Sequence, residues 1–426
     1  MKPEAEKEEP AAAAPVAGDV IGNTAYSERF VLKILLKLAN LDTLKDELED
    51  KSFEDDLCTL WDMTAERDVV LFLQKHDMLN LINFALPTIE SPRLIEIFIG
   101  IIGNMCCQIE VVSVFLKMEG FLTLLLEFVK SDDSLVLIQL LRLVNSSLFL
   151  VDHNNVFIWM ELFKKVEYSN ALYFILKNSS NKDLLVTALE NINTICSYCN
   201  TEKCRTDFFT HFVTSDALEA LSIALTEIII SHKSTIQRDE MERVLVISLQ
   251  TTLNLVSFDK SQEVFKDSKE RVAIIINIVL KYYENKIVDL KEVDSDLVDL
   301  IDSTNTIIST LKVSEISRPE KYFIPSFKIF KTLRLIVNED LNGVSSFEED
   351  DKEELMQFSK QIKCPLSTLL CIYLGNCSEE NFNRALDLIE TDYEDIVKLV
   401  KDKDVKDLVT KRAANHRTRL KENVDS

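Results

Sequence analysis

Glycine and proline are scarce in this sequence: seven glycines and eight prolines occur among 426 residues. Both residues destabilise the interior of a helix, by about 1 kcal/mol for glycine and about 3 kcal/mol for proline. Turns of β-hairpins need glycine or asparagine at positive φ, and no series of such turns separates alternating apolar runs here. The scarcity therefore predicts an all-α protein.

A membrane-spanning run and a signal peptide are also missing. The longest nearly uncharged stretch, Leu94–Cys107, is interrupted by Glu96 and is shorter than the roughly 20 apolar residues that span a bilayer. The first residues carry mixed charges instead of a basic start and an apolar core. We therefore expect a soluble protein of the nucleus, the cytoplasm or both, with no membrane partner. Its nine cysteines are then expected to be reduced thiols.

Catalytic motifs are absent as well. The five histidines are scattered, and the zinc-protease motif H-E-x-x-H, the hydrolase motif G-x-S-x-G and the P-loop motif do not occur. Acidic pairs such as Asp55-Asp56 lie in charge runs, which are typical of solvated faces. We expect no enzymatic activity and no cofactor.

The net charge is strongly negative, at −23. Because a nucleic-acid backbone repels such a chain, the charge disfavours nucleic acid as a partner. An acidic surface suits basic partners, or simply keeps a large protein soluble. Hydrophobic residues make up 46% of the chain, which is ample for a core. Since a single core stops growing near about 250 to 300 residues, we expect domains or a one-dimensional stack.

Four asparagines share one sequence environment, and they are Asn104, Asn145, Asn193 and Asn254. Apolar residues precede all four at matching offsets, which seven residues earlier are Ile97, Ile138, Val186 and Ile247. The intervals between successive asparagines are 41, 48 and 61 residues. A helical repeat of roughly 40 to 47 residues is the signature of armadillo and HEAT proteins. The pattern predicts an armadillo/HEAT-like α-solenoid.

Composition and periodicity divide the chain into five segments. Residues 1–20 are an acidic, Pro- and Ala-rich stretch that we expect to be disordered. The other segments are N-terminal capping helices with an acidic connector over 21–77, armadillo-like repeats over 78–283, degenerate helical repeats over 284–400, and a polar, basic helix or tail over 401–426.

Each predicted repeat has a short apolar helix, a turn and a long helix that bears the asparagine. Capping chemistry marks the turns, with Ser91-Pro92 before one long helix and Ser131–Ser134 and Asn178–Asn181 before the next two. Further along, Pro319 and Pro325 predict a break in helical structure. A degenerate fifth repeat is suggested by Leu374–Cys377, because it resembles the sequence around Asn104.

The asparagines suggest a binding surface. An amide side chain both donates and accepts hydrogen bonds, so a row of asparagines matches an extended peptide backbone, an arrangement for which armadillo proteins are known. We therefore predict a groove lined by the four asparagines that binds other proteins, including extended or basic peptides. The alternative is that each asparagine caps a helix or bonds to a neighbouring loop.

Armadillo proteins that bind import signals place tryptophan four residues before the asparagine. The residues at those positions here are Gly100, Leu141, Leu189 and Gln250. Without tryptophan a lysine stem has no aromatic slot, which argues against import-signal binding of that type. Gly100 and Gly103 indicate instead the close approach of a neighbouring helix.

A metal site is the main chemical alternative. The spacing of Cys196, Cys199, Cys204 and His211 is C-x2-C-x4-C-x6-H, and zinc takes four ligands from such residues. The first two cysteines fall on a helix that otherwise has a core pattern, and buried cysteine is a common small hydrophobe. We favour core thiols over a metal site.

Three segments resemble the serum amyloid A-like family: residues 21–27 (IGNTAYS), residues 60–74 with the Trp61-Asp62-Met63 block, and residues 91–105, which contain Gly100, Gly103 and Asn104. The resemblance is sharp over about residues 20 to 110 and loose beyond. It implies an armadillo-like, intracellular, non-enzymatic protein, nuclear in expectation, of a family associated with promoting cell proliferation. It transfers no catalytic residue.

The sequence therefore favours a helical-repeat scaffold or adaptor. A nucleocytoplasmic transport or chaperone-type receptor remains an alternative, and it requires an aromatic or strongly acidic groove. Trp61 is expected to be a core aromatic, and Asp62 and Met63 are expected to make a helix-end contact.

Overall fold

The computed structural model describes residues 19–40, 42–152, 155–289, 292, 294–341 and 349–424. Among these residues every regular element is a helix and no strand occurs. The predicted all-α, armadillo-like repeat fold is therefore confirmed. The predicted disorder over residues 1–20 lies almost wholly outside the described residues.

The chain forms two compact units that meet between Val166 and Glu167. In unit 1 the helices follow one another in sets of three. The first set is α1 (Glu28–Ala39), α2 (Leu44–Glu49) and α3 (Lys51–Met63). The second set is α4 (Arg67–Lys75), α5 (Met78–Ala85) and α6 (Pro92–Met105). The third set is α7 (Ile109–Phe115), α8 (Glu119–Glu127) and α9 (Ser134–Leu150), after which α10 (Val156–Val166) ends the unit.

The third helices of unit 1 form its core. Helix α6 packs against α3 on one side and α9 on the other, and every residue from Leu94 to Ile102 is buried. A helix that is hydrophobic on all sides has to be covered on all sides. This burial explains the nearly uncharged run in the sequence without a membrane, and no described helix is apolar enough over a sufficient length to cross one.

Side-chain caps set where the long helices begin. The Ser27 hydroxyl accepts from Phe30 N at the start of α1, and the Asp133 carboxylate accepts from Leu135 N and Val136 N at the start of α9. Asn181 accepts from Leu184 N at the start of the corresponding helix of unit 2. These bonds satisfy backbone N–H groups that the helix itself leaves unpaired. The predicted caps are thus confirmed at Asp133 and Asn181, whereas Ser91 precedes Pro92 at the start of α6 without a side-chain cap bond.

Unit 2 repeats the same pattern with longer helices. Its helices are α11 (Tyr168–Asn178), α12 (Lys182–Cys199), α13 (Arg205–Phe212), α14 (Ser215–Ser231), α15 (Arg238–Val256), α16 (Ser261–Val264), α17 (Lys269–Val288), α18 (Asp296–Leu311), α19 (Pro319–Leu341), α20 (Glu349–Asn376), α21 (Glu379–Ile389), α22 (Tyr393–Leu399) and α23 (Lys403–Val424).

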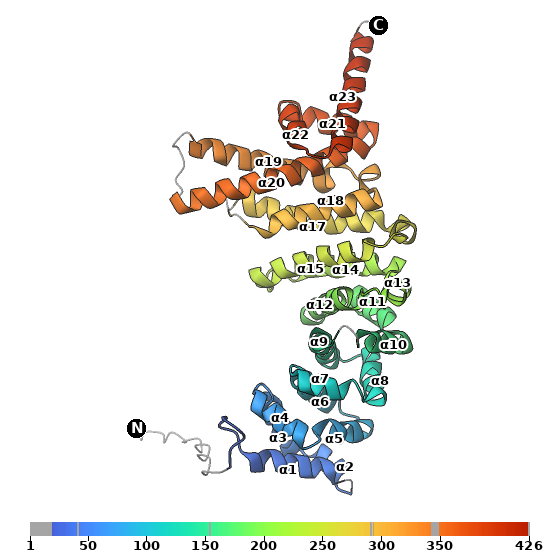
Figure 1. Cartoon of the computed structure of the whole chain (residues 1–426), viewed down its shortest axis with the longest axis vertical. Coiled ribbons are helices and arrows are strands. Elements are labelled where there is room, and N and C mark those ends of the chain that lie inside the picture. The colour runs from blue at the N-terminus through green and yellow to red at the C-terminus, as the bar shows by residue number, and fades with distance from the viewer. Residues whose placement is uncertain are drawn as a thin grey trace, which may run out of the picture. The chain divides into compact units, whose positions relative to one another are not determined.

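Two rows of helices build unit 2. One row consists of α11, α14, α17 and α19, in which each helix contacts the next. The other row consists of α12, α15, α18 and α20, again with successive contacts, and α19 runs alongside α20 where the rows join (Figure 1). Each helix buries one side against its own row and another against the other row, as expected for repeats that cannot bury their apolar faces alone.

One sequence expectation about continuity differs from the structure. The break predicted around Tyr322 is wrong, because α19 is continuous from Pro319 and contains Pro325. Pro325 lies in the second turn of the helix, where it removes one internal hydrogen bond. The neighbouring Tyr322 and Phe323 are both fully buried. Burial of these two aromatic side chains outweighs the local cost of proline.

Candidate functional site

Asn104 joins two helices of unit 1. Its Nδ2 donates to Thr64 Oγ1 at 2.9 Å and to the Trp61 carbonyl at 3.4 Å. Both acceptors belong to the carboxyl end of α3, where backbone carbonyls lack helical partners. The donor half of this amide therefore serves the fold, and Asn104 is half-buried.

The tryptophan of the Trp61-Asp62-Met63 block lies against α6. A Cβ atom added to Gly100 would lie 2.3 Å from indole atoms Cε2 and Cζ2 of Trp61, so the indole occupies the space that any side chain at position 100 would need. Gly103 differs, because a Cβ there would meet the backbone of Leu143 on α9 at an ordinary 3.7 Å. The indole thus accounts for Gly100, whereas the approach of α9 leaves room for a Cβ at Gly103 and does not require glycine there.

The three segments that carry the family resemblance touch one another. Gly22, at φ +52°, lies on the Asp68 side chain, whose Oδ2 accepts from Asn23 N at 2.9 Å. This contact links the loop over residues 21–27 to the start of α4, while Trp61 and Thr64 link α3 to α6. Met63 is buried and Asp62 is exposed. These residues form a packed structural junction at the start of unit 1.

The asparagines of unit 2 lie on neighbouring helices. Asn193 on α12 accepts through Oδ1 from Thr251 Oγ1 of α15 at 3.2 Å. Asn254 on α15 accepts from Gln250 Nε2, one turn earlier in the same helix, at 3.4 Å. Both are half-buried, and among the described residues no acceptor is placed for either Nδ2. The amide donors of Asn193 and Asn254 are therefore left for a partner or water.

The predicted row of four asparagines is divided by the two units. Asn145 is half-buried on α9 of unit 1, next to the helix that bears Asn104. The structure thus places two of the four asparagines on adjacent helices of each unit. Each unit therefore contains one pair of the predicted asparagines.

Sequence reasoning missed a fifth asparagine. Asn305 lies on α18, next to α15 in the same row, and its Nδ2 donates to the Pro365 carbonyl of α20 at 3.1 Å. It follows Asn254 by 51 residues, with Val298 seven residues before it, so the repeat spacing contained the signal. The Asn376 chosen instead sits at the end of α20 and donates to the carbonyl of Ile372 in its own helix.

The outward faces of α12 and α15 form one polar strip. We call the following residues the unit 2 polar strip: Glu190, Asn193 and Ser197 on α12, with Arg243, Gln250, Asn254 and Ser257 on α15. Arg243 joins the two helices through a 2.7 Å ion pair with Glu190. Apart from that pair the strip consists of amides and hydroxyls, which both donate and accept hydrogen bonds.

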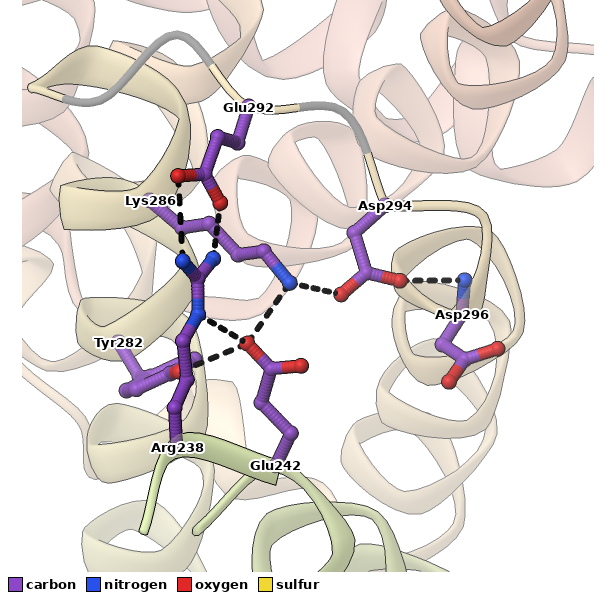
Figure 2. A network of polar contacts seen from close by, with 7 residues as sticks. All are labelled: Arg238, Glu242, Tyr282, Lys286, Glu292, Asp294 and Asp296. Atoms are coloured by element: carbon purple, nitrogen blue, oxygen red, sulfur yellow. Dashed lines mark hydrogen bonds and ion pairs between the residues drawn. The ribbon is translucent and has the colours of Figure 1, made fainter. Parts of the chain in front are cut away.

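The densest charge cluster of unit 2 joins α15, α17 and the segment before α18 (Figure 2). Lys286 is 8% exposed, and its Nζ lies 2.8 Å from Glu242 Oε1 and 2.6 Å from Asp294 Oδ2. Glu242 Oε1 also accepts from Tyr282 at 2.8 Å and from Arg238 at 3.2 Å. Arg238 in turn makes a two-pronged pair with Glu292.

The pKa shifts show that these charges are matched. Burial opposes the charged form of Lys286, yet hydrogen bonds to Asp294 and Glu242 raise its pKa above the ordinary 10.5. Burial likewise opposes ionised Glu242, but its donors hold its pKa below the ordinary 4.5. Burial and the Glu242 carboxylate together raise the pKa of Tyr282 to about 12. A cluster with every charge partnered is suited to fastening the fold, not to moving protons.

The cysteine spacing does not build a metal site. Cys196, Cys199 and Cys204 are all buried, and burial raises the pKa of the Cys196 and Cys199 thiols well above the ordinary range. A metal ligand must be a thiolate. Within the described part of the chain no cluster of His, Cys, Asp or Glu side chains is arranged to hold a metal ion.

The basic residues near the carboxyl end include a structural contact. Arg412 of α23 donates to the Leu374 carbonyl at the end of α20 at 2.8 Å and lies 4.6 Å from the ring centroid of Phe382 on α21. Cations favour a helix carboxyl end because unpaired carbonyls carry partial negative charge there. Arg412 therefore fixes α23 to two other helices.

Comparison with known proteins finds partial relatives. No family model matches this chain. Human protein SAAL1 is 30% identical over 191 residues, which cover 41% of this chain and 39% of the human protein. Protein saal1 of Danio rerio is 30% identical over 177 residues, which cover 39% of this chain and 37% of that protein. This chain is similar to SAAL1. It matches about two-fifths of the length of these relatives.

A solved structure of similar fold is a designed armadillo repeat protein in complex with the peptide (KR)4. It is 12% identical, with a TM-score of 0.43, and the match covers 66% of this chain and 98% of the designed protein.

Proposed function

We propose that this protein is a non-enzymatic scaffold that binds a segment of another protein along the unit 2 polar strip. The observation that supports it most is the pair of uncommitted amide donors, Asn193 Nδ2 and Asn254 Nδ2, on neighbouring helices. Hydroxyls of Ser197 and Ser257 lie one turn further along. An extended backbone presents carbonyls and N–H groups to such side chains, and main-chain hydrogen bonds of this kind supply affinity without sequence specificity.

The chemistry of the strip suits a protein partner better than a charged small ligand. Its only charges are Arg243 and Glu190, which neutralise each other, so neither an anionic nor a cationic small ligand finds a concentrated opposite charge. The transport-receptor alternative needs an aromatic or strongly acidic groove, and the strip is neither. A strip of amides and hydroxyls whose two charges are paired therefore favours a scaffold.

The test removes the two amides. In the Asn193→Ala/Asn254→Ala variant, quantitative affinity capture with mass spectrometry is expected to lose wild-type partners by about tenfold. The variant should remain folded and lose about 1 kcal/mol of stability, because the buried Thr251 hydroxyl loses its Asn193 acceptor. The matched control is Asn170→Ala/Asn178→Ala, which removes two amides from α11 in the other helix row and leaves capture unchanged. Equal capture by all three proteins overturns the proposal.

We extend the proposal to location and biological role through the resemblance described above. The protein acts in the nucleus, the cytoplasm or both, and supports cell proliferation as the resembled family does. Imaging of the tagged full chain tests the location. Depletion is expected to slow cell growth, and the wild-type chain is expected to restore it while Asn193→Ala/Asn254→Ala is not. Restoration by that variant separates any growth role from the polar strip.

A further inference from the structure

The side of α1 that faces away from its neighbouring helices carries two leucines. Its inner face packs on α2, α3 and α5, and Val31, Ile34 and Leu38 are fully buried. On the opposite side Leu32 and Leu36 lie one turn apart, and Leu36 is 71% exposed, more than any other large apolar side chain described except Ile230. Leu32 and Leu36 therefore form a short apolar stripe on the outer side of α1.

A stripe of cations runs beside the leucines. Arg29, Lys33 and Lys37 follow each other at four-residue spacing, which places them on one helix face. The side chains of Arg29 and Lys33 are 83% and 60% exposed, while Lys37 is 20% exposed and pairs with Glu47 at 2.5 Å. Lys37 also lies 4.7 Å from the ring centroid of Phe53 and is fixed in the fold.

The two outer cations are weakly held. Arg29 is 4.0 Å from Asp19 and Lys33 is 3.5 Å from Asp56. Exposed ion pairs at such distances contribute little, about 0 to 1 kcal/mol. Arg29 and Lys33 are therefore free to exchange these carboxylates for those of a partner.

The stripes line one open groove of about 450 Å³ between α1 and the start of α2. Both helices are blue in Figure 1. We call the groove the α1 groove, and its walls include Arg29, Leu32, Lys33, Leu36 and Lys37. Its lining combines Leu32 and Leu36 with the cations Arg29 and Lys33, and it also includes Glu47, which pairs with Lys37. The chain as a whole is acidic, with 71 acidic and 48 basic residues. Local charge of the opposite sign to the whole molecule selects partners.

We propose that the α1 groove binds an acidic amphipathic helix of a partner protein. An apolar side chain of that helix lies between Leu32 and Leu36, and carboxylates one turn away face Arg29 and Lys33. Helix-in-groove recognition uses this combination of apolar anchors at i, i+3 or i+4 with charges on the flank. The surface belongs to unit 1 and is independent of the unit 2 polar strip.

An anionic membrane is the other source of negative charge, and the structure disfavours it. Each cation near a membrane surface adds only about 1 kcal/mol, and three cations act against a net charge of −23. A single helix can approach the α1 groove without bringing the acidic remainder of the chain to a charged plane.

The experiment measures fluorescence anisotropy of a labelled synthetic helical peptide in which leucine and glutamate recur at three- and four-residue spacing. The full-length wild-type chain is expected to bind it saturably, against the overall charge repulsion. Arg29→Glu/Lys33→Glu and, separately, Leu36→Ser are expected to weaken binding by about tenfold. Lys75→Glu/Lys130→Glu changes the net charge of unit 1 equally and should bind as wild type. Circular dichroism confirms that each variant is folded.

Several outcomes overturn the proposal. These are no binding of the probe, equal binding by the Arg29→Glu/Lys33→Glu variant, or an equal loss in Lys75→Glu/Lys130→Glu, which would indicate general charge repulsion. Binding to phosphatidylserine vesicles that Arg29→Glu/Lys33→Glu abolishes, with none to the peptide, assigns the groove to membranes instead.

Two further measurements address occupants from the chain itself. Sedimentation that shows wild-type dimers and monomeric Leu36→Ser assigns the groove to a second copy. Probe binding that appears only after Glu4, Glu6, Glu8 and Glu9 are changed to Gln assigns it to the chain's own first residues. Either result replaces the partner helix and overturns the proposal.

Discussion

The indole of Trp61 occupies the space beside Gly100, and this contact decides which substitutions α6 tolerates. The indole fills the position that a Cβ at residue 100 would take. Three residues on, Gly103 has room for a methyl group. Of these two glycines of α6, only Gly100 is therefore required by its neighbour.

Gly100→Ala is expected to destabilise unit 1 by about 1 to 3 kcal/mol, because the indole has to move out of a packed junction. Gly103→Ala is the matched control. It makes ordinary contacts and gains up to about 1 kcal/mol of helix propensity, so it should be neutral or stabilising. Urea unfolding measures both free energies, and equal values for the two variants would show that Trp61 does not depend on Gly100.

Lys286 is the residue that holds the charge cluster of unit 2 together. In Lys286→Met, Glu242 and Asp294 lose their shared cation in a site where their side chains are 23% and 12% exposed. Removing one member of a buried pair costs about 3 kcal/mol. Lys328→Met removes a 55% exposed lysine from a pair with Glu284 and should cost about 1 kcal/mol or less. Urea unfolding measures both losses of unfolding free energy. Similar losses in the two variants would mean that burial of Lys286 does not strengthen its ion pairs.

The same cluster predicts how stability depends on pH. The folded pKa of Glu242 is lowered, so its contribution is present above the ordinary 4.5 and is lost as pH falls through the lower folded value. The folded pKa of Lys286 is raised, so its contribution is present below 10.5 and is lost as pH rises through the higher folded value. The unfolding free energy of wild type minus that of Lys286→Met should form a plateau between these limits and shrink outside them. A difference that grows on acidification would reverse the assigned sign.

At the scale of the element, α23 packs on α20 through the buried Val409 and Ala413, and Arg412 adds polar contacts to α20 and α21. Arg412 bonds the end of α20, stacks on Phe382, and lies 3.5 Å from Glu379. Arg412→Ala is expected to raise amide hydrogen exchange in α23 by about tenfold through local opening. Lys411→Ala, a change at an exposed neighbour, is the control. Unchanged exchange in the Arg412 variant would show that apolar packing alone holds α23.

Sequence predicted the helices well because helices are local structures. The scarcity of glycine and proline, the apolar periodicity and caps such as Asp133 all act within one turn of the residue concerned. The failure at Pro325 has the opposite cause. Whether a helix survives a proline depends on tertiary burial, here of Tyr322 and Phe323, and no local rule contains that term.

The candidate sites were less predictable, because the partner of a side-chain hydrogen bond depends on tertiary structure. The sequence identified Asn104 and Asn193 as special. It could not show that the amide of each makes a hydrogen bond to a neighbouring helix. It also passed over Asn305, whose surrounding offsets include Thr304 where an apolar residue was expected. The α1 groove was invisible for a similar reason: Leu36 fits an apolar helix pattern equally well whether it is buried or exposed.

At the scale of the whole molecule, the two units each have a core and a charge cluster or junction of their own. We expect Lys286→Met to lower the stability of unit 2 alone and Gly100→Ala to lower that of unit 1 alone. Differential scanning calorimetry of the two variants should displace different parts of the unfolding profile. One cooperative transition that both variants shift as a whole would show that the units unfold together.

The location of the aromatic residues gives this chain a built-in optical label. Its only two tryptophans are Trp61 and Trp159, and both belong to unit 1. Tryptophan fluorescence excited selectively therefore reports on unit 1. It does not report on unit 2, where tyrosine is the chromophore. Binding of a partner beside α3 or α6 can be followed, without an attached dye, by quenching or a spectral shift of tryptophan fluorescence. Binding at the unit 2 polar strip should leave the tryptophan fluorescence unchanged.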